Sequence, residues 1–506
     1  MWNILGQLIP MLVGLASIPL LIRCLGNERF AILSLIWMVT GYFGLFDLGL
    51  GRALTQAVAE KLGAHRVHEI PPLVTSVVWL MLGMGALAGA LFWGLTPYAV
   101  AHWMSIPGAL KGEAQWAGLF VALAIPWIVS GTALRGVLEA AHRFDLVNIL
   151  RMPLAAGLYL VPAVVAYFTR ELTSVVFSIL FLRIIGFFLH WWACQKIFPD
   201  LRFRSGYQHK IIKPLYTFGL WMTVSNIVSP IMVQMDRFYV GAVVSLSAVA
   251  YYSTAYELVS RAYALPMAIT AVLFPAMTKA FAADVLRASV GSEKQNWAES
   301  KKTYLQSFKI LALAVFPMMF LLGFFSYEIV WVWLGADYAK VCSPILQIFA
   351  FGVCFNAMAN VPFNFLQAIG KPDLTAKIHL FELPIYILAL KYLTETWGLP
   401  GAAWTWSLRV IGDLILMLII TQTKALPIPE FLNWSFWLKR VGGPLTIAAL
   451  TFYLAQILTW PWKLAFTAAS LPLFLIITYK YILSVSDRDL IKEKLFIKLQ
   501  NKRRRS

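Results

Sequence analysis

The sequence holds 506 residues, of which 60% are hydrophobic and only 13% are charged, and its formal net charge is +18. A soluble globular protein carries about 25% charged residues, so this composition excludes that class and places the apolar surface in lipid. The basic residues lie mainly in short segments between apolar runs, which is typical of topology control, so nucleic acid is not an expected partner.

The apolar runs predict an all-α integral membrane protein of about 14 transmembrane helices, because about 20 apolar residues cross the hydrocarbon. The first six predicted spans are Asn3–Ile22, Ala31–Leu50, Leu73–Leu95, Ala114–Leu134, Val147–Phe168 and Leu172–Cys194. The next six are Leu215–Met235, Ala248–Met277, Tyr304–Phe325, Val341–Ile369, Leu374–Leu393 and Leu399–Thr421. Two more follow at Val441–Leu458 and Leu464–Leu483.

The segments between the spans predict the organisation and orientation of the chain. About 30 Lys and Arg residues fall on one side of the membrane and about 8 on the other, so we expect both termini in the cytoplasm. Lys463 is one of the few on the poor side, where we expect it in a loop. The predicted domains are an N-lobe at 1–200, a C-lobe at 201–425, two further spans within 426–485, and a basic cytoplasmic tail at 486–506.

Several acid–base pairs lie at membrane depth, where charged groups are costly. Glu257 and Arg261 are four residues apart on one predicted helix, and Arg409 and Asp413 repeat that spacing, so each pair should share a helical face. For each pair, a structural interpretation is open as well, in which the two charges neutralise each other and orient helices.

Further charges extend this pattern in the first half of the chain. Arg135, Glu139 and Arg143 predict a stripe on one helical face after the fourth span, and Asp47 precedes Arg52 by five residues at the end of the second. Arg183 has no acid within a helical turn. The net positive charge at depth favours an anionic substrate, since the Arg fork binds phosphate oxygens. Exporters of organic cations should show unpaired acids instead.

The sequence contains no pattern that requires an enzyme or a cofactor. The histidines form no HExxH motif, and the four cysteines have neither metal nor redox spacing. Asp487-Arg488-Asp489 resembles the DxD of sugar-nucleotide transferases but lies in the basic tail. We therefore predict no catalytic residue, no metal site and no cofactor.

A set of short motifs follows one order along residues 5 to 420. They are Ile18-Pro19-Leu20-Leu21-Ile22-Arg23, the Asp47–Arg52 stretch, Leu134-Arg135-Gly136-Val137-Leu138-Glu139, Asp236-Arg237-Phe238, Tyr256-Glu257-Leu258-Val259-Ser260-Arg261, Leu273-Phe274-Pro275, Glu382-Leu383-Pro384, and Gly401-Ala402-Ala403 leading to Arg409 and Asp413. This order resembles the polysaccharide-export branch of the multidrug/oligosaccharidyl-lipid/polysaccharide (MOP) superfamily, nearest to the Wzx-type O-antigen flippases.

The resemblance implies two six-helix lobes around a central cavity that opens to alternate sides of the bacterial cytoplasmic (inner) membrane, plus two C-terminal helices. It implies a lipid-linked oligosaccharide on undecaprenyl pyrophosphate as substrate, with polysaccharide polymerase and chain-length proteins as candidate partners beside membrane lipids. The matching substrate-binding positions are Arg52 and Arg261, extended to Arg135, Arg151, Arg237 and Arg409. Asp47, Glu257 and Asp413 are candidates for ion coupling or ion pairing.

Three rival functions remain open at this point. A multidrug exporter of the same superfamily would bind organic cations, which the net positive charge at depth disfavours. A polysaccharide polymerase or ligase would be expected to place catalytic residues in a sizeable outer loop, and the span map has none. A scaffold in a polysaccharide assembly complex would leave the deep charges idle.

Overall fold

Helices form every regular element that the computed structural model describes, over residues 2–43, 50–103, 105–202, 232, 234–289, 297–424 and 457–477. This confirms the predicted all-α class. The long helices are α1 (Trp2–Phe43), α2 (Leu50–Gly63), α3 (Ile70–Tyr98), α4 (Lys111–Ala140), α5 (Phe144–Thr169), α6 (Leu172–Ile197), α8 (Leu246–Ala262), α9 (Ala264–Ser289), α10 (Ala298–Phe324), α11 (Ser326–Leu334), α12 (Ala336–Ala368), α13 (Pro372–Lys424) and α17 (Trp460–Ile477).

Nine helical runs among the described residues are long and apolar enough to cross a membrane. Two of the helices are much longer than one crossing, because α1 has 42 residues and α13 has 53, or about 60 and 80 Å at 1.5 Å per residue. Each contains one break, at Gly26 with φ 75° and at Gly398 with φ 60°. Glycine adopts these left-handed values without strain, so each long helix divides where the sequence predicts two successive spans.

The chain folds as two compact units. Unit 1 comprises residues 1–254 and 386–402, and unit 2 comprises residues 255–385 and 403–506. The segment around residues 203–231 lies outside the described residues, as do the predicted thirteenth span and the basic tail. The predicted division into domains at 200, 425 and 485 therefore stays a prediction.

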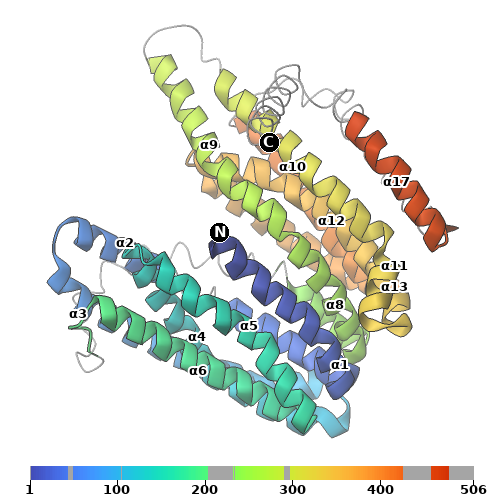
Figure 1. The fold of residues 1–506 in the computed structure, drawn as a ribbon, viewed down its shortest axis with the longest axis horizontal. Coiled ribbons are helices and arrows are strands. Elements are labelled where there is room, and N and C mark those ends of the chain that lie inside the picture. Colours follow the sequence, from blue (N-terminus) through green and yellow to red (C-terminus); the bar gives the residue numbers. More distant parts are fainter. Residues whose placement is uncertain are drawn as a thin grey trace, which may run out of the picture. The chain divides into compact units, whose positions relative to one another are not determined.

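Close helix packing holds unit 1 together. Helices α3, α4 and α6 run side by side, with α5 against α6 (Figure 1). A Cβ added at Gly85 would lie 2.6 Å from the Cα of Pro126, and one at Gly89 would lie 2.4 Å from the carbonyl oxygen of Ala122. Two glycines four residues apart thus let the backbones of α3 and α4 touch, which is the small-residue mode of packing in membranes.

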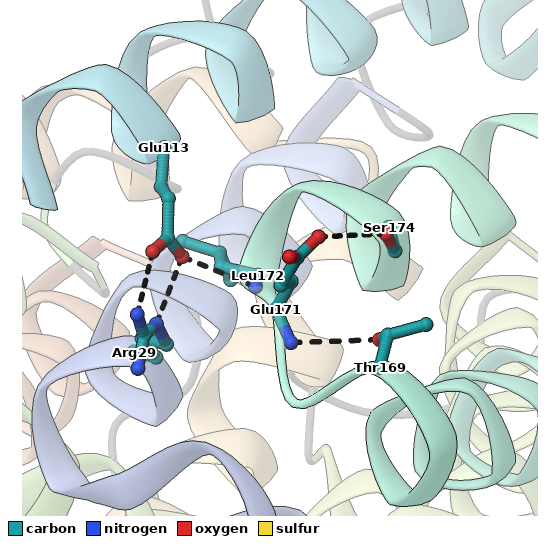
Figure 2. A network of polar contacts seen from close by, with 6 residues as sticks. All are labelled: Arg29, Glu113, Thr169, Glu171, Leu172 and Ser174. Atoms are coloured by element: carbon teal, nitrogen blue, oxygen red, sulfur yellow. Dashed lines mark hydrogen bonds and ion pairs between the residues drawn. The ribbon is translucent and has the colours of Figure 1, made fainter.

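A polar network joins α1 to the first turns of α4 and α6 in unit 1 (Figure 2). The Arg29 guanidinium faces the Glu113 carboxylate of α4, and the backbone N–H of Leu172, the first residue of α6, donates to the same carboxylate at 3.2 Å. Figure 2 also shows Ser174 donating to Glu171 at the start of α6. A carboxylate is favourable at a helix N-terminus, so Glu113 stabilises the start of α6 and also pairs with Arg29 of α1.

In unit 2, α12 is the helix around which others pack. It lies against α9, α10 and α11 and is mostly buried along its length. The short helix α11 was not expected from the sequence, because its nine residues are too few to produce a span signal.

Two local expectations were wrong. Helix α4 ends at Ala140, and His142 takes a left-handed conformation with φ 55°, so Arg143 leaves the predicted stripe and pairs with Asp145 at 2.8 Å. The helix that holds Asp236 and Arg237 continues to residue 243, so these two residues lie inside it, whereas the sequence places them at its end.

Candidate functional site

The Glu257–Arg261 pair forms as the spacing predicts. On α8 the Nη2 of Arg261 lies 3.1 Å from Oε2 of Glu257, and the Arg261 side chain is 11% exposed. Both residues belong to unit 2. Four residues make about one helical turn, so this contact fixes the direction of the Arg261 guanidinium along α8.

Three ionisable side chains of α13 meet in unit 2. Nε2 of His379 lies 3.6 Å from Oδ1 of Asp413, and Glu382 completes a group whose nitrogen and carboxylate oxygens all lie within 4.8 Å of one another. The sequence predicted Asp413 as an ion-coupling candidate and placed it on a face with Arg409. It did not single out His379 or Glu382 for this role, although their i,i+3 spacing was a signal that they share a helical face.

Arg237 is buried beside an acid in unit 1. It is 6% exposed, and its backbone N–H donates to Oδ1 of Asp236 at 2.8 Å. The second oxygen of Asp236 accepts the Tyr252 hydroxyl at 2.6 Å. Both oxygens of Asp236 are therefore engaged by the chain itself, and the predicted contact of the Arg237 side chain with substrate stays a prediction.

Two of the predicted arginines are exposed on their helices. Nε of Arg135 lies 3.1 Å from Oε1 of Glu139, with both side chains well exposed on α4, and Arg151 is exposed on α5. Exposed ion pairs of this kind contribute about 0–1 kcal/mol. Arg52 lies in α2, but its side chain falls outside the described part of the structure, and so does Asp47.

Unit 1 contains an apolar cavity of about 640 Å³. Its lining comes from α1, α3, α4, residues 99–106 and residues 234–242, and includes Tyr42, Phe92, Leu95, Trp103 and Phe238. Among the side chains that the structure describes, none of the predicted substrate-binding arginines lines this cavity. Its described lining is apolar, and its size is that of a ligand site.

Buried ionic contacts also occur where the sequence did not place them. Lys463 of α17, expected in a loop, is 4% exposed, and its Nζ lies 2.7 Å from Oε1 of Glu328 in α11. The same ammonium group donates to the carbonyl oxygen of Phe324 at 3.4 Å. Arg183 of α6, by contrast, has an Nε with no hydrogen-bond partner among the described residues.

Comparison with known proteins places this chain in a family. A model of the family described as polysaccharide biosynthesis protein matches residues 20–344. A Shigella flexneri protein named "Putative O-antigen transporter" is 30% identical over 419 residues, which covers 82% of this chain and 95% of that protein. The lipopolysaccharide biosynthesis protein WzxC of Escherichia coli is 20% identical, over 83% of this chain and 78% of WzxC.

Solved structures share the fold at low sequence identity. The lipid II flippase MurJ, in an inward closed conformation, superposes with a TM-score of 0.67 at 15% identity, covering 90% of this chain and 97% of MurJ. An inward-facing multidrug resistance transporter of the MATE family also gives a TM-score of 0.67, at 14% identity, covering 83% of this chain and 99% of that one. Together with the family match, these results show that the chain is a multi-pass membrane protein of the polysaccharide biosynthesis protein family, with Wzx-type homologues and the fold of the MOP superfamily.

Proposed function

We propose that this chain is a flippase, which moves an undecaprenyl-pyrophosphate-linked oligosaccharide across the bacterial cytoplasmic membrane by alternating access. The observation that carries the proposal is the 30% identity to an O-antigen transporter homologue over 95% of that protein's length. The likeness to MurJ supports it at the level of the fold.

The proposed chemistry is transport and forms no covalent bond. The sugar and pyrophosphate are too polar to cross hydrocarbon unsolvated, because a charged group at the bilayer centre costs about 3 kcal/mol or more. The protein replaces that barrier with a polar path, while the prenyl chain stays among apolar side chains. Alternating access then follows from rocking of one bundle of helices against another.

Within this mechanism, Arg261 is proposed to bind the pyrophosphate, together with Arg52. Arg261 is oriented by its contact with Glu257, and its planar guanidinium has the geometry that binds phosphate oxygens. Arg409 is a further candidate in unit 2. Arg135 and Arg151, which are exposed on their helices, stay candidates for the same role. The same proposal places both termini of the chain in the cytoplasm.

The test uses the full chain reconstituted in liposomes with a fluorescent lipid-linked oligosaccharide. A membrane-impermeant quencher reports the fraction of substrate in the outer leaflet over time. We expect Arg261→Ala to slow flipping at least about tenfold, and Arg261→Lys to recover part of that loss, because Lys keeps the charge without the planar fork. The matched control is Lys377→Ala, which removes an exposed i,i+4 pair with Asp373 on α13.

The outcomes separate the residue from the function. If the wild-type chain flips the substrate and Arg261→Ala flips it at the same rate, Arg261 has no part in the mechanism. No flipping by the wild-type chain of any lipid-linked oligosaccharide, together with transport of an organic cation, would overturn the flippase proposal in favour of a multidrug exporter.

A further inference from the structure

The His379, Glu382 and Asp413 side chains form an ionisable cluster that the mechanism above does not use. His379 and Glu382 precede the break at Gly398 in α13, and Asp413 follows it. Their ligand atoms lie within 4.8 Å of one another, so the three groups form one electrostatic site inside unit 2.

The two carboxyl groups of this cluster are buried and poorly satisfied. Glu382 is 6% exposed and Asp413 is 7% exposed. Both oxygens of Glu382 and Oδ1 of Asp413 have no hydrogen-bond partner in the described part of the chain. A buried ionised carboxylate without partners is strongly unfavourable, and a second one beside it adds like-charge repulsion.

The charged and titratable groups around the two carboxyl groups determine the net charge of the cluster. Asp413 and Arg409 both act electrostatically on Glu382, and Asp413 also acts on Tyr263, which lies in the turn between α8 and α9. His379, whose ring stacks on Phe363 of α12, is the third neighbour. One guanidinium offsets one carboxylate, so a single additional positive charge makes the cluster neutral.

A proton fits this requirement better than a metal ion does. Hard cations prefer shells made of oxygen ligands, whereas one donor here is an imidazole nitrogen. Zinc and other divalent transition metals accept this donor set, but their two charges would leave the cluster with one positive charge in excess. The His379 side chain is 20% exposed and that of Asp413 is 10% exposed, so His379 is the more accessible of the two. Chains of Asp, Glu and His are the groups that carry protons through membrane proteins.

We propose that Glu382 and Asp413 share one exchangeable proton, which His379 passes to and from water, and that binding of this proton drives the translocation cycle. On binding, the proton forms an O–H bond with one carboxylate oxygen, and on release it returns to water, so no other reactant is needed. The coupling part rests on the proposed flippase function, whereas the proton site itself does not.

The proton site can be tested without any transport. Infrared difference spectra of the purified protein, recorded during a pH titration, report the carbonyl stretch of protonated carboxyl groups. We expect the wild-type chain to keep a protonated carboxyl signal at pH values where free carboxyl groups are ionised, and Glu382→Gln and Asp413→Asn each to lose it. Asp373→Asn is the matched control on the same helix, since Asp373 is exposed and paired with Lys377.

A second variant distinguishes loss of the carboxyl group from a general folding defect. Glu382→Asp retains a carboxyl group at the site and is expected to keep the signal, so its loss only in Glu382→Gln is not a general folding defect. An unchanged signal in both Glu382→Gln and Asp413→Asn, with folded protein by gel filtration, would overturn the proposal.

Coupling is tested in the liposome assay with imposed gradients. The pH gradient is imposed in each direction in turn. One of the two directions should accelerate wild-type flipping about fivefold or more, which corresponds to a modest coupling free energy. For Glu382→Gln and Asp413→Asn, we expect the rate of substrate flipping to be the same with and without the gradient. Acceleration by a sodium gradient in place of a pH gradient would overturn the proton as the coupling ion. An infrared signal without any flipping would support the proton site and contradict the flippase proposal.

Discussion

The guanidinium of Arg29 binds both carboxylate oxygens of Glu113, with Nε 2.8 Å from Oε2 and Nη2 2.6 Å from Oε1. This fork is the strong form of a charge-assisted hydrogen bond. Because the Leu172 N–H donates to the same carboxylate, one side chain connects α4 to α1 and to the N-terminus of α6.

We therefore expect Glu113→Ala to destabilise the protein by about 1.5–3 kcal/mol, the range for hydrogen bonds to charged groups. The loss should be visible as a lower unfolding temperature, followed by tryptophan fluorescence of the detergent-purified protein. Asp373→Ala is the control, because it removes an exposed ion pair on α13. If Arg29→Ala and Glu113→Ala add independently in a double-mutant cycle, the two residues do not act through each other.

The contact between α3 and α4 allows a test within one helix. Gly89→Ala would place a methyl group 2.4 Å from the Ala122 carbonyl oxygen, so we expect a loss of about 1–3 kcal/mol from overpacking. Gly83, on the same helix, has nothing within 4 Å of its added Cβ. Gly83→Ala should leave the unfolding temperature unchanged or raise it slightly, because alanine favours the helix. Equal unfolding temperatures for the two variants would contradict the close approach.

The sequence was sufficient for features that depend on local spacing. Apolar runs of the right length located the long helices, and i,i+4 spacing correctly paired Glu257 with Arg261, because four residues return the chain to the same helical face. Gly85 and Gly89 are also four residues apart, and both meet the backbone of α4 in the structure. Each of these follows from the helical repeat alone.

Contacts that depend on the orientation of a helix about its axis, or on where a helix ends, could not be predicted from residue spacing. The cluster of His379 with Asp413 requires the chain to return after Gly398, across 34 residues, with both side chains facing inward. Arg143 left its predicted stripe because α4 ends at Ala140. Lys463 looked like a loop charge because its partner, Glu328, is distant in the sequence.

The ion pair between Lys463 and Glu328 predicts how α17 is attached to unit 2. Lys463 is the buried residue at the start of a helix whose other described side chains are largely exposed. Removal of one partner leaves a buried charge unpaired, which costs about 3–5 kcal/mol. We expect Lys463→Ala to release α17, which should appear as faster hydrogen exchange in residues 460–477.

A compensating variant separates charge pairing from packing. Lys463→Met combined with Glu328→Leu removes both charges and fills similar volume, so it should restore slow exchange in α17. Protection of α17 that is unchanged in Lys463→Ala would show that contacts other than this pair hold the helix.

The exposed side of the Glu257–Arg261 pair predicts competition between the acid and an anionic substrate. If Arg261 binds pyrophosphate, Glu257 opposes that binding by charge repulsion and by occupying one donor. A partly exposed pair is worth up to about 1 kcal/mol, so Glu257→Gln should tighten binding of a water-soluble prenyl pyrophosphate up to about fivefold. Isothermal titration calorimetry of the purified protein measures this affinity directly.

The sign of that change distinguishes two roles for the acid. The control is Asp373→Asn, which neutralises the acid of an exposed i,i+4 pair and should leave the affinity unchanged. Tighter binding that weakens as salt is added would fit an electrostatic competition at Arg261, because salt screens charges that solvent can reach. Weaker binding in Glu257→Gln would mean instead that the acid positions the guanidinium for its ligand, since the freed side chain would lose its orientation.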